Sequence, residues 1–295
     1  MQAKNRMREF ASFHPAVNFI YFFAVIGFSM FFMNPVCLLI SFVCATVYSV
    51  MLSGRRAAFF NLFFLMPVIL ITAIMNPAFN HEGETVIAYL PSGNQLTLES
   101  MVYGVAAGTM LAGVICWFSC FNKIMTSDKF VYLFGRVMPS FSLVLSMTLR
   151  FVPHFKNQFK NAADAQRGIG RGYTEGGFIK RAKCALTILS IMITWALENA
   201  VETSDSMKSR GYGTSKRTAF SIFSLTRRDI FALVFLICDS AYIIAAHRLG
   251  GAYYRYFPSI KFDVSGGAAL GIFTAYMLLC LFPVFIEIKE ALRWK

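Results

Sequence analysis

Long apolar stretches, separated by short polar or proline-containing breaks, dominate the order of residues along this chain. Six of them are close to 20 residues long and almost free of charge, and they cover approximately residues 17–33, 35–52, 57–75, 100–121, 229–246 and 266–286. A helix of that length crosses the hydrocarbon core of a bilayer, which is about 30 Å thick. We therefore predict an all-α, polytopic membrane protein with about six transmembrane helices.

The polar breaks divide the chain into three parts. Residues 1–122 hold four of the apolar runs, residues 123–228 form one large polar and amphipathic block, and residues 229–295 hold the last two runs. Pro35 is expected to end one helix and begin the next, and a second Met-Asn-Pro at 75–77 is expected to end the third run. Two short β-prone arms around Ser92-Gly93-Asn94 predict a hairpin near residues 85–100.

Composition agrees with a membrane protein, because 57% of the residues are hydrophobic and only 15% are charged. A soluble domain carries about a quarter charged residues. The net charge of +13 is therefore first a topology signal, and no nucleic-acid partner is expected. The seven cysteines form no CxxC pair, so neither disulfides nor zinc is suggested.

The cations are distributed unevenly between the loops. Residues 57–122 contain no Lys or Arg, whereas residues 123–228 contain 17. Between the last two runs there are only three, Arg248, Arg255 and Lys261. The positive-inside rule then places both termini in the cytoplasm, and the central block in the cytoplasm or against the membrane surface.

Two long amphipathic helices are predicted inside the central block. The first, about residues 140–168 with a break at Pro153, carries a basic stripe, and the second, about 181–209, carries an acidic stripe. The basic stripe consists of Lys156, Lys160 and Arg167, and the acidic stripe of Glu198, Glu202 and Asp205. Acidic residues four apart repel one another, so we expect the two helices to cross with opposite charges facing. The alternative is two solvated faces.

Each of these helices ends in an arginine beside glycine, in "AQRGIGRG" and in "MKSRGYG". A guanidinium at a helix C-terminus gains from the helix dipole, and a neighbouring glycine lets a partner surface approach the backbone. The planar guanidinium suits a carboxylate partner. An ordinary cationic C-terminal cap is the alternative for either end, and it is less favoured because the pattern occurs twice.

The segments "SMTLRFVPHFKNQFKNAADAQRGIGRG", "DSMKSRGYG" with "KRTAF", and the N-terminal "FHPAVNFIYFF" resemble the transmembrane (T) component of energy-coupling factor (ECF) transporters, the EcfT/CbiQ family. The resemblance is sharp at residues 145–172 and 205–220. It implies a prokaryotic plasma-membrane subunit that links two ABC ATPases to a substrate-binding membrane protein, the S component, for uptake of a vitamin or a metal ion.

The same resemblance implies which residues contact the ATPases. The second docking motif is Ser209-Arg210-Gly211, with Arg210 as the docking residue. The first is Gln166-Arg167-Gly168, where the sequence departs from the family pattern, so that either Arg167 or Arg171 serves. It also implies that this chain is not an enzyme and binds no cofactor itself, because ATP and magnesium belong to the ATPases.

Other chemistry has weaker support. "GIGRGY" follows a predicted helix and is not followed by the Lys-Ser of a phosphate loop, and the four histidines are scattered without a metal-binding spacing. Asp239 lies inside a predicted span, where an acid marks an ion or proton site or forms a hydrogen bond between helices. A stand-alone secondary transporter or channel is the alternative function, although no internal repeat supports it.

Overall fold

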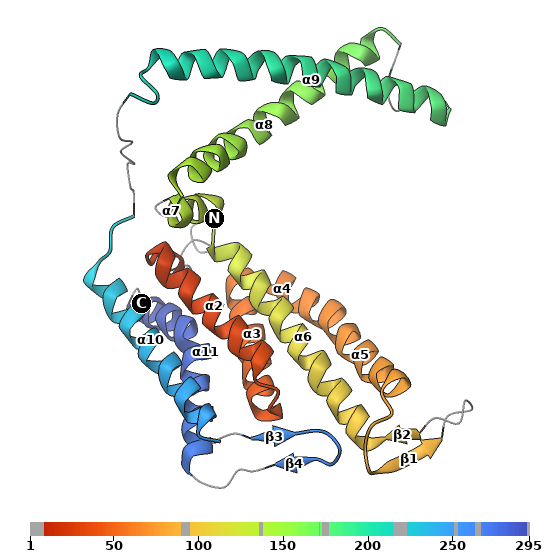
Figure 1. The fold of residues 1–295 in the computed structure, drawn as a ribbon, viewed down its shortest axis with the longest axis vertical. Coiled ribbons are helices and arrows are strands. Elements are labelled where there is room, and N and C mark those ends of the chain that lie inside the picture. Colours follow the sequence, from red (N-terminus) through yellow and green to blue (C-terminus); the bar gives the residue numbers. More distant parts are fainter. Residues whose placement is uncertain are drawn as a thin grey trace. The chain divides into compact units, whose positions relative to one another are not determined.

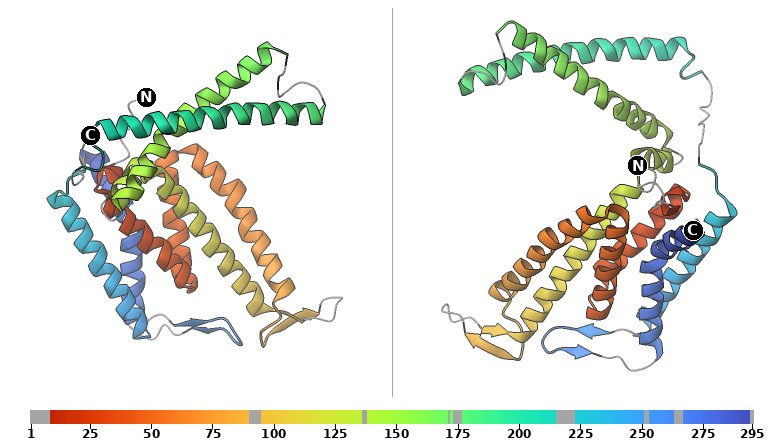
Figure 2. Two further views of the ribbon diagram at one scale, coloured as in Figure 1. Left: turned by 45° about the horizontal axis from the view of Figure 1, so that its top comes forward. Right: turned by 180° about the vertical axis from the view of Figure 1, so that it is seen from behind.

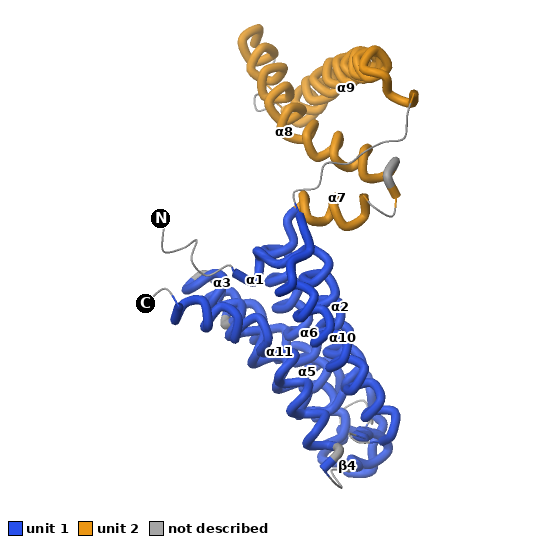
Figure 3. The backbone as a smooth tube through the Cα atoms, turned by 90° about the vertical axis from the view of Figure 1, so that its left-hand side faces the viewer, with its two compact units in different colours: residues 1–126, 223–295 blue, residues 127–222 orange. Residues whose placement is uncertain are grey.

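The structure is a computed structural model. It describes residues 9–89, 95–135, 138–170, 172, 177–214, 223–250, 253–262 and 267–293. Its backbone divides into two compact units (Figure 3), which are residues 1–126 with 223–295, and residues 127–222. We call them the transmembrane unit and the coupling unit. The predicted hairpin tip at Ser92–Asn94, the candidate Arg171, and the cations Lys216 and Arg217 lie outside the described residues.

The transmembrane unit is a bundle of helices with a β-hairpin pair at one end (Figure 1). Its helices are α1 (Glu9–Ser12), α2 (Pro15–Phe31), α3 (Pro35–Ser53), α4 (Arg55–Phe60), the π-helix η2 (Asn61–Leu65), α5 (Met66–Phe79), α6 (Leu98–Ile124), α10 (Arg227–Arg248) and α11 (Gly267–Arg293).

Prolines and capping side chains define several helix ends, and the boundary predicted at Pro35 is confirmed. Pro15 and Pro35 each stand in the first turn of a helix, and the side chains of His14 and Asn34 cap those helices by accepting backbone N–H groups. Pro77 differs from the prediction, because α5 continues through it to Phe79. A proline in the last turn removes only one helical hydrogen bond, and the helix ends two residues later.

Six helices of the described chain are long and apolar enough to cross a membrane, which confirms the polytopic all-α class. The set differs from the six predicted runs. It includes Phe178–Ser209 of the coupling unit, and it omits α2, which has only 17 residues. Length and composition therefore do not separate a transmembrane helix from a long amphipathic one.

An aromatic cluster forms the core of the transmembrane unit. Trp117, Tyr21, Tyr48 and Tyr276 are its largest fully buried side chains. The indole N–H of Trp117 on α6 donates a hydrogen bond to the hydroxyl oxygen of Ser41 on α3 at 3.0 Å. Since a buried donor without a partner is costly, this bond fixes how α3 and α6 pack.

Two hairpins meet at one end of this unit. Strand β1 (Val86–Tyr89) pairs with β2 (Gln95–Thr97), as predicted, and β3 (Tyr254–Arg255) pairs with β4 (Lys261–Phe262), which the sequence analysis did not predict. The backbone N–H of Glu84 donates to the carbonyl of Pro258 at 3.2 Å, so the two hairpin segments are joined. Figures 1 and 2 show both hairpins at the same end of the bundle.

At the opposite end, α1 contacts the start of α10. The Arg228 guanidinium forms an ion pair with Glu9 at 2.5 Å and lies 4.2 Å from the centre of the Phe13 ring. Asp229 is buried and accepts hydrogen bonds from the backbone N–H groups of His14 and Thr226. The first residues after the coupling unit are thereby held to the N-terminal part of the chain.

The coupling unit contains α7 (Ser127–Gly135), α8 (Pro139–Gly168) and α9 (Phe178–Ser209). The break expected at Pro153 is absent, because α8 continues through this residue. The neighbouring hydrogen bonds of a 30-residue helix remain when proline removes one of them. Its glycine-rich C-terminal stop occurs where it was predicted.

Candidate functional site: the crossing helices and their arginine tips

The end of α9 has the geometry of a Schellman motif. Arg210 is the C-cap residue, and Gly211 follows with a φ of +81°. The N–H of Gly211 donates to the carbonyl of Lys208 at 2.9 Å, and the N–H of Tyr212 donates to that of Met207 at 3.1 Å. A positive φ favours glycine, so the backbone conformation at position 211 accounts for the glycine found there. The Arg210 side chain is exposed at this helix end.

The end of α8 is similar in its backbone. The helix includes Gly168, and Gly170 follows with a φ of +74° and donates its N–H to the carbonyl of Arg167 at 3.0 Å. Arg167 is exposed in the last helical turn, whereas the side-chain oxygen of Gln166 is buried and accepts no hydrogen bond from the residues that the structure describes. The structure therefore places Arg167 at a helix end comparable to that of Arg210.

Helices α8 and α9 cross (Figures 1 and 2), and an apolar seam joins them there. Ala162 and Ala163 of α8 form a buried cluster with Ile188 and Met192 of α9, and Trp195 packs against it. The Trp195 ring also lies 5.1 Å from the His154 ring and 5.2 Å from the Phe155 ring, between centroids. Two adjacent alanines allow the helices to approach, and the larger side chains of α9 fill the contact.

The two lysines of the basic stripe are not paired with the acidic stripe in the described part of the chain. Within the described chain, no ion pair joins Lys156 or Lys160 of α8 to the acidic residues of α9. Glu198 and Glu202 are exposed, and Asp205 forms an ion pair with Lys208 of its own helix at 3.9 Å. Lys156 and Lys160 are exposed as well, and it is the short alanine side chains of α8 that pack against the partner helix.

The sequence analysis missed Ile188, Met192 and Trp195 as the residues that hold the crossing together. A signal was present, because Cys184, Ile188, Met192 and Trp195 recur at a spacing of three or four within an apolar run. Nearly every neighbour in this run is also apolar, however, so the periodicity alone does not distinguish the packed face. Burial in the folded chain does, since Ile188 is 1% exposed and Ile193 is 52% exposed.

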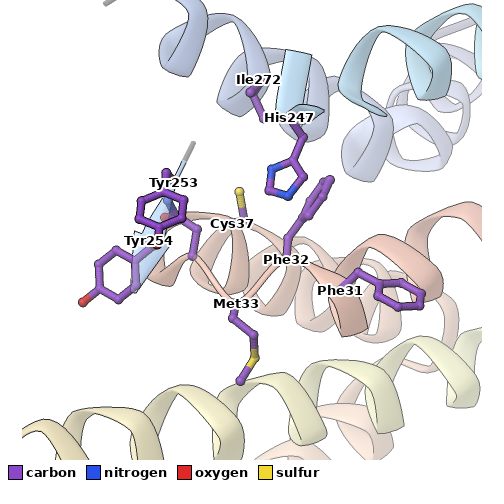
Figure 4. Close-up of a pocket in the computed structure, with 9 residues that line it drawn as sticks. Phe31, Phe32, Met33, Cys37, His247, Tyr253, Tyr254 and Ile272 are labelled. Carbon is purple, nitrogen blue, oxygen red and sulfur yellow. The ribbon is translucent and has the colours of Figure 1, made fainter. Parts of the chain in front are cut away.

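A cavity of about 220 Å³ lies in the transmembrane unit near the hairpin end (Figure 4). The His247 ring and the Phe32 ring border it with their centroids 4.6 Å apart, and Cys37 and Tyr253 contribute further walls. In the described part of the chain, no three His, Cys, Asp or Glu side chains are grouped so that they could hold a metal ion.

Fold and site together define a class: a polytopic membrane protein that carries two long crossing helices, each tipped by an arginine at a glycine-terminated end. Comparison with known proteins then identifies the family. The model of the family CbiQ, described as "Cobalt transport protein", matches residues 11–220, which is more than two thirds of the chain. The chain belongs to the CbiQ/EcfT family of ECF transporter T components.

Individual relatives carry consistent names. The "Energy-coupling factor transporter transmembrane protein EcfT" of Lactobacillus helveticus is 37% identical over 97 residues, which are 32% of this chain and 35% of the relative. The protein of the same name from Bacillus selenitireducens is 26% identical over 199 residues, which are 64% of this chain and 74% of the relative. The alignment thus spans about a third of the Lactobacillus relative's length.

Proposed function

We propose that this chain transmits ATP-driven motion from two cytosolic ABC ATPases to a substrate-binding membrane S component, and that Arg167 and Arg210 are its contacts with the ATPases. The observation that carries this proposal is the pair of exposed arginines at the glycine-terminated ends of two helices that share one apolar seam. Because the seam links the helices, a displacement of one arginine tip is passed to the other helix.

The chemistry of the tips supports a protein partner with carboxylate groups. A guanidinium binds a carboxylate through two parallel hydrogen bonds, and the adjacent glycines leave the backbone accessible. Ser209 and Gly211 flank Arg210, and Gln166 and Gly168 flank Arg167. Arg171 stays a second candidate for the first tip.

The exposed face of α9 supports a membrane partner. At about 100° per residue, a stripe of apolar side chains lies opposite the Ile188 face. Each member is more than half exposed, and the stripe consists of Leu186, Leu189, Ile193, Leu197 and Val201. Contiguous exposed apolar surface marks an interaction site, and we assign this stripe to the S component.

Co-purification tests the assignment. The tagged chain is expressed in its own host, solubilised gently, and compared with Arg210→Ala and Lys208→Ala, which each remove one exposed cation from the same helix end. Loss of one partner of a buried charged contact costs roughly 3–5 kcal/mol. We therefore expect the ATPases to be lost with Arg210→Ala and retained with Lys208→Ala.

Arg167→Ala and Lys160→Ala form the corresponding pair on α8. Retention of both ATPases and of substrate uptake by the Arg167→Ala, Arg210→Ala double variant would show that the tips are not the docking residues. A chain that purifies alone in every form, and still moves a solute in liposomes, would instead be a self-sufficient transporter. The identity of the membrane protein that copurifies would indicate the substrate.

A further inference from the structure

The beginning of α9 presents two large apolar side chains to solvent. Phe178 is 88% exposed and Ile179 is 83% exposed, which places them among the most exposed large apolar side chains of the described chain. At about 100° per residue, Ala182 lies between them on the same face, one turn further along the helix, and it is exposed as well. Exposed apolar side chains that share one face mark an interaction site.

Cations accompany these apolar side chains. Three follow within the next four residues, and residues 178–197 contain no acid. Lys180 and Lys183 are exposed, and no ion pair reaches either of them from the residues that the structure describes. Even when Glu175 before the helix is counted, residues 175–183 hold three cations and one acid, which is a net charge of +2. The surface is therefore both apolar and basic.

We call Phe178, Ile179, Lys180 and Lys183 the α9 basic patch. Its lysines do not stabilise the helix by themselves, because cations gain from the helix dipole at the C-terminal end and not in the first turns. Like charges three residues apart also repel one another. Nor do its apolar side chains pack on α8, since the α8–α9 seam is formed by residues further along, such as Ile188. The patch fits a partner that is anionic and also accepts apolar side chains.

The surface of an anionic bilayer has both properties. Apolar side chains of an amphipathic helix enter the boundary between headgroups and acyl chains, while lysine ammonium groups reach the lipid phosphates. The positive-inside rule predicts the cytoplasmic side for this part of the chain, and the cytoplasmic leaflet is the one that carries anionic lipids. An acidic protein surface offers partners for the lysines, whereas a bilayer also offers an apolar layer directly beneath its charged one. We propose that the α9 basic patch binds the anionic phospholipid surface of the cytoplasmic leaflet.

This contact is separate from those proposed above. The stripe assigned to the S component begins at Leu186, and Arg210 lies 32 residues after Phe178, which is roughly 48 Å along the helix. The α9 basic patch therefore gives α9 a contact with lipid at the end opposite its arginine tip. Neither the ATPases nor the S component is needed to form it.

A fluorescent label on the patch tests the contact. The purified full-length chain is placed in nanodiscs of phosphatidylcholine, with or without anionic phosphatidylglycerol, and some lipids carry a nitroxide quencher near the headgroup. The label is attached to Ala182→Cys in a Cys238→Ser background, because the other six cysteines are buried. We expect the lipid quencher to reach the label strongly in the anionic nanodiscs and weakly in the neutral ones. High salt should reduce the difference, since it screens the attraction between the lysines and the phosphates.

Single substitutions separate the charge from the apolar contact. One cation close to an anionic membrane surface contributes about a factor of five in binding, so Lys183→Gln should lower the ratio of quenched to unquenched label about fivefold in anionic nanodiscs. Lys208→Gln is the matched control, because it removes an exposed cation from the other end of the same helix, and it should leave the ratio unchanged within about 1.5-fold. Phe178→Ser should lower the ratio in both kinds of nanodisc. All three side chains are exposed, so equal melting temperatures would show that folding is intact.

Equal quenching in neutral and anionic nanodiscs would overturn the proposal, and so would equal effects of Lys183→Gln and Lys208→Gln. A label that no lipid quencher reaches would also overturn it. If that label became protected only after the ATPases were added, the patch would belong to an acidic protein surface instead. The nanodisc measurements contain this chain alone, so their failure would leave the proposed coupling function untouched.

Discussion

The apolar seam between α8 and α9 predicts that truncation of the buried Ile188 side chain strongly weakens the contact between the two helices. Ile188 is 1% exposed and is the central residue of a cluster with only four buried members. Replacing a buried isoleucine by alanine costs roughly 2–5 kcal/mol. Because this cluster is small and its surroundings are exposed, we expect a value near the lower end of this range. Ile188→Ala should lower the free energy needed to separate the two helices by about 2–3 kcal/mol.

Cys184 reports this separation directly. It lies one turn before Ile188 on the same face of α9 and is buried. In a Cys238→Ser background, the rate at which maleimide modifies Cys184 measures how often the crossing opens. A cost of 2–3 kcal/mol corresponds to an approximately 30- to 150-fold faster rate, since each 1.4 kcal/mol is about tenfold in an equilibrium.

Ile193→Ala is the matched control, because it makes the same chemical change in the same helix at a side chain that is 52% exposed. Its labelling rate should stay within about threefold of the parent. Equal rates for the Ile188 and Ile193 variants would refute the seam as the contact that holds the helices together. A faster rate at the buried cysteines of the transmembrane unit as well would show global unfolding and not opening of the crossing.

Two further predictions concern the transmembrane unit. A Cβ at Gly108 would lie 3.0 Å from Cα of Ile69 on α5. Gly108→Ala should therefore destabilise the unit by roughly 1–3 kcal/mol, measured by melting in detergent. Gly113→Ala is the control, because the nearest neighbour of its added Cβ lies at 3.9 Å, and this variant should be neutral or slightly stabilising. Arg228→Gln should cost about 1 kcal/mol by removing the half-exposed ion pair and ring contact, and Arg227→Gln should cost less than about 0.5 kcal/mol. The Arg228 effect should shrink in 1 M salt, and an effect unchanged by salt would contradict an ionic contact.

Some features of the fold were readable from the chain because their causes are local. Five of the six apolar runs correspond to candidate spans, Pro35 marks a helix boundary, and Gly211 marks the end of α9. Each depends on residues within one or two helical turns. The prolines at 77 and 153 were over-interpreted for the opposite reason, since a helix held by its neighbouring hydrogen bonds tolerates one missing donor.

The candidate site shows the same division. The sequence alone determined that two amphipathic helices end in arginine and glycine, because propensity and periodicity act along the chain. Only the tertiary structure decided that alanines and Ile188, and not lysines and glutamates, form the crossing, and that Glu84 joins Pro258. These outcomes depend on contacts between residues far apart in sequence. In a chain where most positions are apolar, hydrophobicity marks too many faces to say which of them meet.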